Sequence, residues 1–287
     1  MSSSVRVADA LTVRGRRFAW GERTYVMGIV NATPDSFSGD GVPDANGAIE
    51  RGLGLLAAGA DLLDIGAEST RPGHTPIDER EERRRLEPVV AGLRAQAPDA
   101  VLSIDTYKPA VFAAAFAAGA DMLNSIWGLD DALLAVARET GVPVAIMHNK
   151  RVAVYARDVV AEVLAALETQ ALRALAAGIA RERIVLDPGI GFGKTPEHNL
   201  ALLAALDRLV ALGFPTLLGT SRKSTIGKLT GRDVSTRTYG TAATVALAAA
   251  AKIDIVRVHD VAEMRDVVAV ADAIARGWRP KGWQERL

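Results

Sequence analysis

The stretch AGADLLDIG, residues 58–66, joins the end of an alanine-rich helical segment to a short apolar run. The phrase returns as AGADMLNS at residues 118–125, and a related phrase, LGFP at 212–215, precedes a third apolar run. Glycine ends a helix readily because it adopts positive φ without a steric penalty. We therefore expect these phrases to be helix-to-strand connections that lie together on one side of the molecule.

Short apolar runs recur along the chain, each followed by a polar or glycine-marked loop and then by an alanine- and leucine-rich helical stretch. Strands that alternate with helices form parallel sheets, and such strands read as continuous apolar runs because helices cover both faces. The runs are 25–30, 62–65, 101–104, 122–123, 144–147, 184–186, 216–218 and 255–258. This pattern predicts an α/β fold, a single-domain (β/α)8 TIM barrel spanning residues 25–280.

Residues 1–24 are expected to form an N-terminal extension. Within it, Leu11–Val13 and Arg17–Trp20 flank Gly15, a pattern typical of a hairpin that would close the barrel floor. Residues 281–287 are expected to form a C-terminal tail. The charge run DEREERRR at 78–85 is interpreted as the solvated first turns of a helix.

The composition excludes several classes of function. Hydrophobic residues make up 49% of the 287 positions, so the chain can bury a large core. Lysine plus arginine and aspartate plus glutamate each number 34, so no net charge attracts nucleic acid. The absence of cysteine excludes thiolate chemistry and disulfides. With no apolar run long enough to span a membrane and no signal-like start, we expect a soluble cytoplasmic protein.

Polar residues follow every predicted strand. In a TIM barrel these positions form the mouth where active sites lie, and burying so many polar side chains without a function would be costly. They are Asn31, Glu68, Asp105, Asn124, His148, Asp187, the segment Thr220–Lys223, Arg257, His259 and Asp260.

The glycine-rich segment DPGIGFGKT, residues 187–195, resembles a nucleotide-binding loop but lacks the required spacing. Pro188 occupies the position of the first P-loop glycine, and the glycines are spaced G-x-G-x-G rather than G-x-G-x-x-G. Asp187 would repel a phosphate but would accept hydrogen bonds from an N–H-rich ring edge. We therefore expect the glycines to let a flat ring approach the backbone.

Other mouth residues suit the same kind of ligand. Asp105 and Asn124 offer oxygen acceptors to a nitrogen heterocycle, and Lys223 offers a donor. Arg257 and His259, two positions apart on one strand, point to the same side. Together with Asn31, and opposite the acidic and amide groups, they could hold a diphosphate, with Mg²⁺ as an oxygen-ligated partner ion.

Taken together, the motifs at these strand ends resemble the dihydropteroate synthase family from about Val26 to the last helix. The motifs are GIVNATPDSFSGDG at 28–41, DIGAESTRPG at 64–73, SIDTYKP at 103–109, LNSIWG at 123–128, MHNK at 147–150, LDPGIGFGKTPEHN at 186–199, GTSRKSTIG at 219–227 and RVHDV at 257–261.

The resemblance implies a (β/α)8 barrel and a defined reaction. In that reaction p-aminobenzoate displaces pyrophosphate from 7,8-dihydropterin pyrophosphate, with Mg²⁺, to form 7,8-dihydropteroate in folate biosynthesis. It also implies a homodimer and a sulfonamide target, with small-molecule substrates and neither nucleic-acid nor membrane partners.

The resemblance further assigns roles residue by residue. The implied pterin-binding residues are Asp105, Asn124, Met147, Asp187, Phe192, Gly219 and Lys223. The implied pyrophosphate-binding residues are Asn31, Arg71, Arg257 and His259, with Asn31 also contacting Mg²⁺. The implied p-aminobenzoate-binding residues are Phe37, Thr70, Pro72 and Ser224. The implied catalytic residues are Asp35, Lys223, Arg257 and His259.

The chain departs from the family pattern at Ala32, at Ser125 and in the order of Gly39 and Asp40. We expect Ser125, which stands where aspartate usually follows the asparagine, to deprive Asn124 of a neighbouring acceptor. Two alternatives share the barrel: a corrinoid methyltransferase that uses methyltetrahydrofolate, and a pterin-binding homologue without turnover. The basic residues at Lys223, Arg257 and His259 argue against both.

Overall fold

The computed structural model describes residues 10–33, 44–68 and 76–285. In this part of the chain, eight parallel strands are hydrogen-bonded in the order β8-β7-β6-β5-β4-β3-β10-β9. A bridge between Leu186 and Thr216 connects the two ends of this sheet and closes the barrel. The strands are β3 (Tyr25–Asn31), β4 (Leu62–Gly66), β5 (Leu102–Asp105), β6 (Met122–Ser125), β7 (Val144–Met147), β8 (Ile184–Asp187), β9 (Leu217–Leu218) and β10 (Ile255–Val258).

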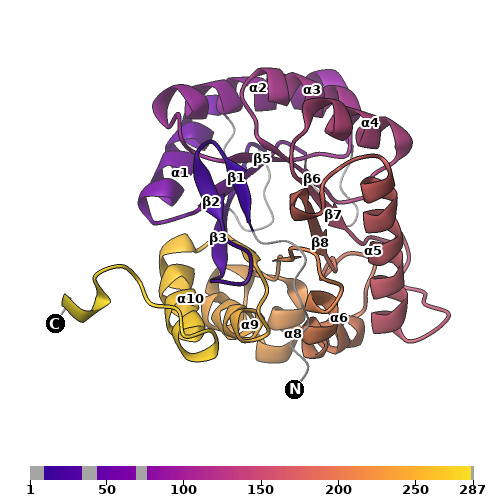
Figure 1. The fold of residues 1–287 in the computed structure, drawn as a ribbon, viewed down its shortest axis with the longest axis vertical. Helices are drawn as coiled ribbons and strands as arrows, with labels where there is room; N and C mark the ends of the chain where they lie inside the picture. The colour runs from indigo at the N-terminus through magenta and orange to yellow at the C-terminus, as the bar shows by residue number, and fades with distance from the viewer. Residues whose placement is uncertain (1–9, 34–43, 69–75, 286–287) are drawn as a thin grey trace.

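Helices form a ring around these strands, as Figure 1 shows. They are α1 (Ala45–Ala57), α2 (Glu79–Gln96), α3 (Pro109–Ala117), α4 (Asp131–Thr140), α5 (Val159–Ala176), α6 (Pro196–Ala204), α7 (Leu206–Val210), α8 (Ser224–Thr230), α9 (Thr238–Ala250) and α10 (Val261–Ala275). Short 3-10 helices cover Arg181–Arg183, Val234–Thr236 and Trp283–Glu285. The predicted (β/α)8 barrel is therefore confirmed. None of the described helices combines the length and apolar character that a membrane span requires.

The helix-to-strand phrases have the geometry expected of them. Gly59, Gly119 and Gly213 have φ values of +97°, +113° and +76°, which glycine adopts without strain. An aspartate just before a strand then accepts an N–H from the preceding strand segment. The pairs are Asp61 with Val26 N–H at 2.9 Å, Asp121 with Leu102 N–H at 3.0 Å and Asp254 with Thr216 N–H at 2.9 Å. These carboxylates tie neighbouring strands together on the floor side.

A hairpin of β1 (Leu11–Val13) and β2 (Arg16–Phe18) closes the floor, as predicted. Arg14 and Gly15, at its turn, both have positive φ, the arrangement whose twist suits a two-residue hairpin loop. The floor aspartates hold the hairpin: Arg14 Nε lies 2.6 Å from Asp121 Oδ1, and Gly21 N–H donates to Asp254 Oδ1 at 2.9 Å.

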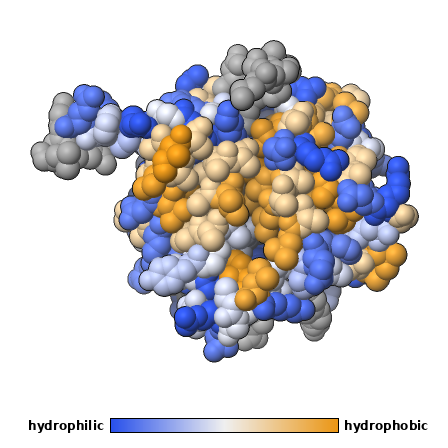
Figure 2. Space-filling model, turned by 90° about the horizontal axis from the view of Figure 1, so that it is seen from below, coloured by the Kyte–Doolittle hydropathy of each residue, from blue (hydrophilic) through white to orange (hydrophobic). Residues whose placement is uncertain are grey.

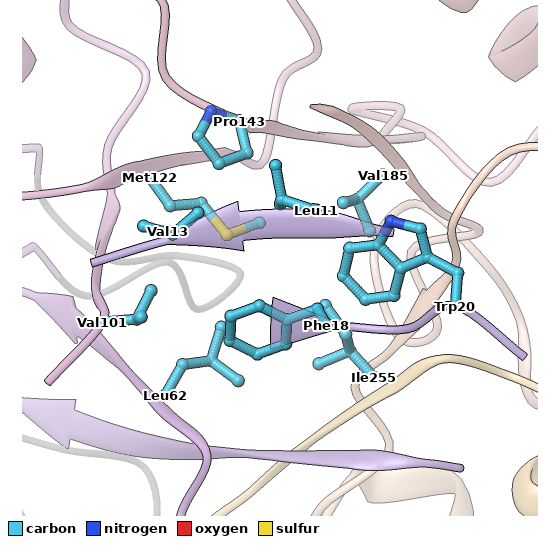
Figure 3. A pocket seen from close by; sticks show the side chains of 10 residues that line it. All are labelled: Leu11, Val13, Phe18, Trp20, Leu62, Val101, Met122, Pro143, Val185 and Ile255. Carbon is cyan, nitrogen blue, oxygen red and sulfur yellow. The ribbon is translucent and has the colours of Figure 1, made fainter. Parts of the chain in front are cut away.

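The barrel has two apolar cores. The larger one fills the space between the strands and the helices. The smaller one lies inside the barrel floor, where the hairpin side chains face the strand residues (Figure 3). The lining of this floor leaves an apolar cavity of about 10 Å³, too small for a substrate. The floor is therefore a packed plug.

Candidate active site

A layer of polar side chains lies inside the barrel just beyond the apolar floor. Side chains alternate along a strand, so the residue two positions after each floor residue points the same way. The floor residues Leu62, Met122, Val185 and Ile255 belong to four different strands. The residues two positions later are Asp64, Asn124, Asp187 and Arg257. Because side chains two positions apart point the same way, these four polar residues also point into the barrel, one layer nearer the mouth.

Asp64 connects several members of this layer. Its Oδ2 atom accepts a hydrogen bond from Asn124 Nδ2 at 3.0 Å and another from Arg257 Nε at 2.6 Å. Arg257 also donates through Nη2 to Asp105 Oδ2 at 3.1 Å. Four residues from β4, β5, β6 and β10 therefore form one hydrogen-bonded network.

Burial shapes the electrostatics of this network. It raises the pKa of Asp105, an effect that Arg257 opposes and that the negative charge of Asp64 reinforces. Burial would lower the pKa of Arg257, but Asp64 and Asp105 more than offset this, so the guanidinium stays charged. We had expected basic groups to lie opposite the acidic ones. Instead Arg257 lies between two carboxylates, because an unpaired charge at this depth would be costly.

Asp187 and Lys223 form the neighbouring part of the mouth. Asp187 Oδ1 accepts the Gly189 N–H at 2.7 Å, and burial raises the pKa of its carboxyl. Lys223 Nζ donates to Ile190 O at 2.5 Å and lies 4.1 Å from the centroid of the Phe192 ring. Burial lowers the pKa of Lys223 to about 8, although Asp187 and Asp105 favour its charged form.

The glycines of residues 189–193 pack closely against other parts of the protein. All three have positive φ, and a Cβ atom on Gly189 would lie 2.0 Å from His148 O. A Cβ on Gly193 would lie 2.1 Å from Lys150 O, and one on Gly191 would lie 2.9 Å from Lys223 Cδ. These glycines therefore permit close contact with other parts of the protein.

Lys194, the lysine of the same segment, is turned inward. Its Nζ atom donates to Phe192 O at 2.9 Å and His148 O at 3.2 Å, and lies 3.0 Å from His148 Nδ1. Burial lowers the pKa of Lys194 to about 7. Lys194 thus fastens the glycine-rich loop to the end of β7, which explains why the segment resembles a phosphate loop without having its geometry.

His259 follows β10 at the mouth, two residues after Arg257. Its Nδ1 atom lies 2.8 Å from Ser221 Oγ, and its backbone N–H donates to the same hydroxyl at 3.1 Å. The next residue along the chain, Asp260, forms an ion pair with Arg222, which has a positive φ of 56°. These contacts connect the ends of β9 and β10, so Lys223 and His259 are held by joined loops.

A second buried cluster lies where α2 and α3 begin. Lys108 Nζ contacts Glu68 Oε2 at 2.5 Å, Glu82 Oε2 at 2.6 Å and Ile77 O at 2.7 Å, and Tyr107 donates to Glu68 Oε1 at 3.0 Å. The charge run at 78–85 does begin a helix, α2, as predicted. It is not wholly solvated, however, because Glu82 is only 1% exposed and forms a salt bridge with Lys108.

The structure brings part of the predicted site together. Asp105, Asn124 and Arg257 share one network, while Lys223 contacts the loop that follows Asp187. Gly219 faces the Arg257 side chain, and a Cβ built on it would lie 3.9 Å from Arg257 Cβ. Met147, Asn31 and Ser224 stand at the ends of β7 and β3 and at the start of α8. The predicted residues Asp35, Phe37, Thr70, Arg71 and Pro72 lie outside the described residues.

Asp64 is a site residue that the sequence did not predict, and the effect expected of Ser125 is wrong. A carboxylate inside the apolar run LLDIG was the available signal for Asp64. Ser125 does not leave Asn124 without an acceptor, because Asp64 supplies that acceptor from the next-but-one strand. The Ser125 hydroxyl instead donates to Gly128 O at 2.5 Å.

Comparison with known proteins first identifies the protein family. The chain belongs to the family described as pterin binding enzymes, whose model matches residues 27–259. Within this family, its curated relatives include the dihydropteroate synthases of Clostridium beijerinckii and Synechocystis sp. The first is 42% identical over 93% of this chain and 100% of that protein. The second is 43% identical over 91% of this chain and 93% of that protein.

Solved structures agree with this grouping. The Xanthomonas albilineans dihydropteroate synthase with 4-aminobenzoic acid is 44% identical, with a TM-score of 0.86 over 93% of this chain and 98% of that chain. A structure of the same enzyme in complex with 7,8-dihydropteroate has 42% identity and a TM-score of 0.83, over 92% and 98% of the two chains.

Proposed function

We propose that this chain catalyses the dihydropteroate synthase reaction. In this reaction the amine of p-aminobenzoate attacks the methylene carbon of 7,8-dihydropterin pyrophosphate. A C–N bond forms, the C–O bond to pyrophosphate breaks, and the amine loses a proton. The main support for this proposal is the buried network of acidic, amide and basic side chains above a sealed floor. This network belongs to a chain that is 42–44% identical to dihydropteroate synthases.

The network supports a pterin ring as the buried ligand. Asp105 Oδ1 and Asp64 Oδ1 are buried acceptors that have no hydrogen-bond partner among the described residues. Unpaired buried acceptors are costly, whereas a ring edge rich in N–H groups would satisfy them. We assign the ring to Asp105, Asn124, Asp187 and Lys223, with Met147, Phe192 and Gly219 around it.

The diphosphate is assigned to Asn31, Arg71, Arg257 and His259. The described residues contain no cluster of three or more metal-ligating His, Asp or Glu side chains. This suits Mg²⁺ held mainly by substrate oxygens and water, with the Asn31 amide oxygen as its protein ligand. When bound, the ion would neutralise charge on the leaving pyrophosphate.

The protein's own contribution is positioning and electrostatic stabilisation. An aromatic amine is already nucleophilic near neutral pH, so no covalent protein nucleophile is required. Arg257 and His259 stabilise the departing pyrophosphate, while Lys223 orients the ring. We assign p-aminobenzoate to Phe37, Thr70, Pro72 and Ser224, and a catalytic role to Asp35. Sulfonamides, one of which occupies the Yersinia pestis dihydropteroate synthase structure, are expected to compete for this subsite.

We also propose that the protein is a cytoplasmic homodimer joined through α9 and α10. Helix α9 has no charged residue, although it lies at the surface. Figure 2 shows hydrophobic residues gathered on the side that carries these helices. The exposed fractions of Tyr239 and Ile274 are 90% and 82%, and Leu247 and Val270 are also exposed. An apolar surface of this kind is typical of a subunit interface.

Sedimentation tests the dimer. Leu247→Glu would place a charge in the interface, so the variant is expected to sediment as a monomer. Leu172→Glu is the matched control, because Leu172 is an exposed leucine on a different helix, α5. Equal sedimentation of wild type and Leu247→Glu would refute an interface at this position.

Pyrophosphate release tests the reaction. Purified protein with Mg²⁺ is expected to release pyrophosphate when both substrates are present and not with either substrate alone. Pterin binding without pyrophosphate release would instead support a non-catalytic homologue. Methyl transfer from methyltetrahydrofolate to a corrinoid, without pyrophosphate release, would support the methyltransferase alternative.

A further inference from the structure

Asp64 differs from the buried aspartates of the barrel floor. Asp121 and Asp254 bind hairpin groups and strand backbone at the floor, where their role is to hold the fold together. Asp64 has no exposed surface, and its hydrogen bonds go to Asn124 and Arg257, side chains from two other strands. Both partners belong to the assigned substrate site.

The contacts of Asp64 determine how its two partners are oriented. Only the NH₂ group of an amide can donate to a carboxylate, so the Asn124 Nδ2 atom must face Asp64. The Asn124 amide oxygen is therefore turned away from Asp64 and is free to face a ligand N–H. In the same way, Asp64 holds the Nε edge of Arg257, which fixes the plane of its guanidinium group.

A buried carboxylate at this position is poorly suited to stabilising the fold. Desolvation of a carboxylate costs several kcal/mol in real proteins, and replacement of buried ion pairs by apolar groups is often neutral or stabilising. Its second oxygen, Oδ1, is buried without a partner among the described residues. These features indicate a residue retained for the geometry and charge of the site.

We propose that Asp64 is a positioning residue for pterin recognition. It holds the amide of Asn124 with its oxygen toward the ligand, and it holds the guanidinium of Arg257 between itself and Asp105. This inference rests on the proposed function, because it concerns the same ring-binding site. It adds a residue that selects ligands presenting N–H donors to Asn124 over ligands presenting acceptors.

The negative charge of Asp64 also acts on Asp105. The charged groups that influence the Asp105 carboxyl are Arg257 on β10, Asp64 on β4, Glu82 on α2 and Lys223 after β9. Removal of the Asp64 charge would leave Arg257 to stabilise ionised Asp105 with less opposition. The pKa of Asp105 should therefore fall when Asp64 is neutralised.

Asp64→Asn provides the test, because the substitution preserves shape while it removes the charge. The matched control is Ser103→Ala. Ser103 is the register partner of Asp64 on β5, is equally buried, and has a hydroxyl without a partner among the described residues. For each protein we would measure the Kd of 7,8-dihydropterin pyrophosphate from pH 5.5 to 8.5, together with kcat, KM and the thermal unfolding midpoint.

Asp64→Asn is expected to raise this Kd by about ten- to a hundred-fold, the usual effect of losing hydrogen bonds to a charged group. The acid limb of the binding profile should move to lower pH, and the unfolding midpoint should fall only modestly, because Arg257 loses one of its two buried carboxylate partners but keeps Asp105. Ser103→Ala should bind within about two-fold of wild type, since no described contact is lost. A purely structural role for Asp64 would lower the unfolding midpoint without moving the pH profile.

A double-mutant cycle with Asn124→Ala supplies a second measurement. If Asp64 acts through Asn124, Asp64→Asn should have much less effect on Kd in the Asn124→Ala background. Additive effects, or wild-type affinity and pH profile in Asp64→Asn, would overturn the inference. Should Asp64→Asn unfold, Asp64→Ser is measured in its place. If the wild-type protein itself bound no pterin, the proposed function would fail instead.

Discussion

The ionisation of Lys223 makes a sharp prediction about the pH dependence of turnover. Lys223 Nζ donates to Ile190 O at 2.5 Å and lies over the Phe192 ring, and both contacts favour the protonated amine. Burial nevertheless lowers the pKa of Lys223 to about 8. For that pKa, the protonated fraction is about 0.9 at pH 7 and about 0.1 at pH 9.

If the protonated amine is required, kcat/KM for 7,8-dihydropterin pyrophosphate should fall about ten-fold between pH 7 and pH 9. The assay follows pyrophosphate release at saturating p-aminobenzoate across this range. The Kd of 6-hydroxymethyl-7,8-dihydropterin, which lacks phosphates, is measured in parallel. An alkaline limb seen in both measurements cannot arise from ionisation of the substrate phosphates.

Two variants show which residue causes the fall in activity at alkaline pH. Lys223→Arg keeps its charge throughout the range, so its residual activity should show no fall between pH 7 and pH 9. Lys194 is the other described lysine with a clearly lowered pKa, about 7, and Lys194→Met should retain the limb near pH 8. A flat wild-type profile, or an unchanged limb in Lys223→Arg, would refute the reasoning.

Three substitutions test the site and its scaffold. Asp187→Asn should weaken pterin binding by about ten-fold or more, because its NH₂ group puts a donor where the ring needs an acceptor; unchanged affinity by calorimetry would contradict that role. Asp254→Ala should lower the free energy of unfolding by roughly 3 kcal/mol, since the buried donors of Gly21 and Thr216 lose their acceptor, as urea denaturation can measure. Gly193→Ala should destabilise the protein by about 2 kcal/mol, because its φ is +58° and Lys150 O would lie 2.1 Å from the new Cβ. Its control, Gly54→Ala, lies in open space on α1 and should be neutral or stabilising by up to about 1 kcal/mol; equal effects of the two glycine substitutions would show that backbone conformation is not the cause.

Local signals in the sequence were sufficient to predict the architecture. Each predicted apolar run overlaps an observed barrel strand, and the runs at 144–147 and 255–258 match β7 and β10 residue for residue. The hairpin turn at Gly15 and the helix-ending Gly59, Gly119 and Gly213 were also recognisable. These features depend on burial of a continuous strand and on positive φ, and both can be recognised from a few neighbouring residues in the sequence.

The partners of the polar residues were decided only by the tertiary structure. The sequence put Asp105, Asn124 and Arg257 at strand ends but did not show that Asp64 holds two of them, or that Arg257 lies between carboxylates. Likewise, the sequence predicted that Glu82 is solvated, because it lies in a charge run. In the structure it is buried against Lys108, which lies at the start of the following helix. Asp64 and Arg257 are 193 residues apart in the chain, and they meet because β3 pairs with β4 on one side and with β10 on the other. Periodicity reports which face of a strand is buried, whereas ion pairing depends on which distant strands the closed barrel brings together.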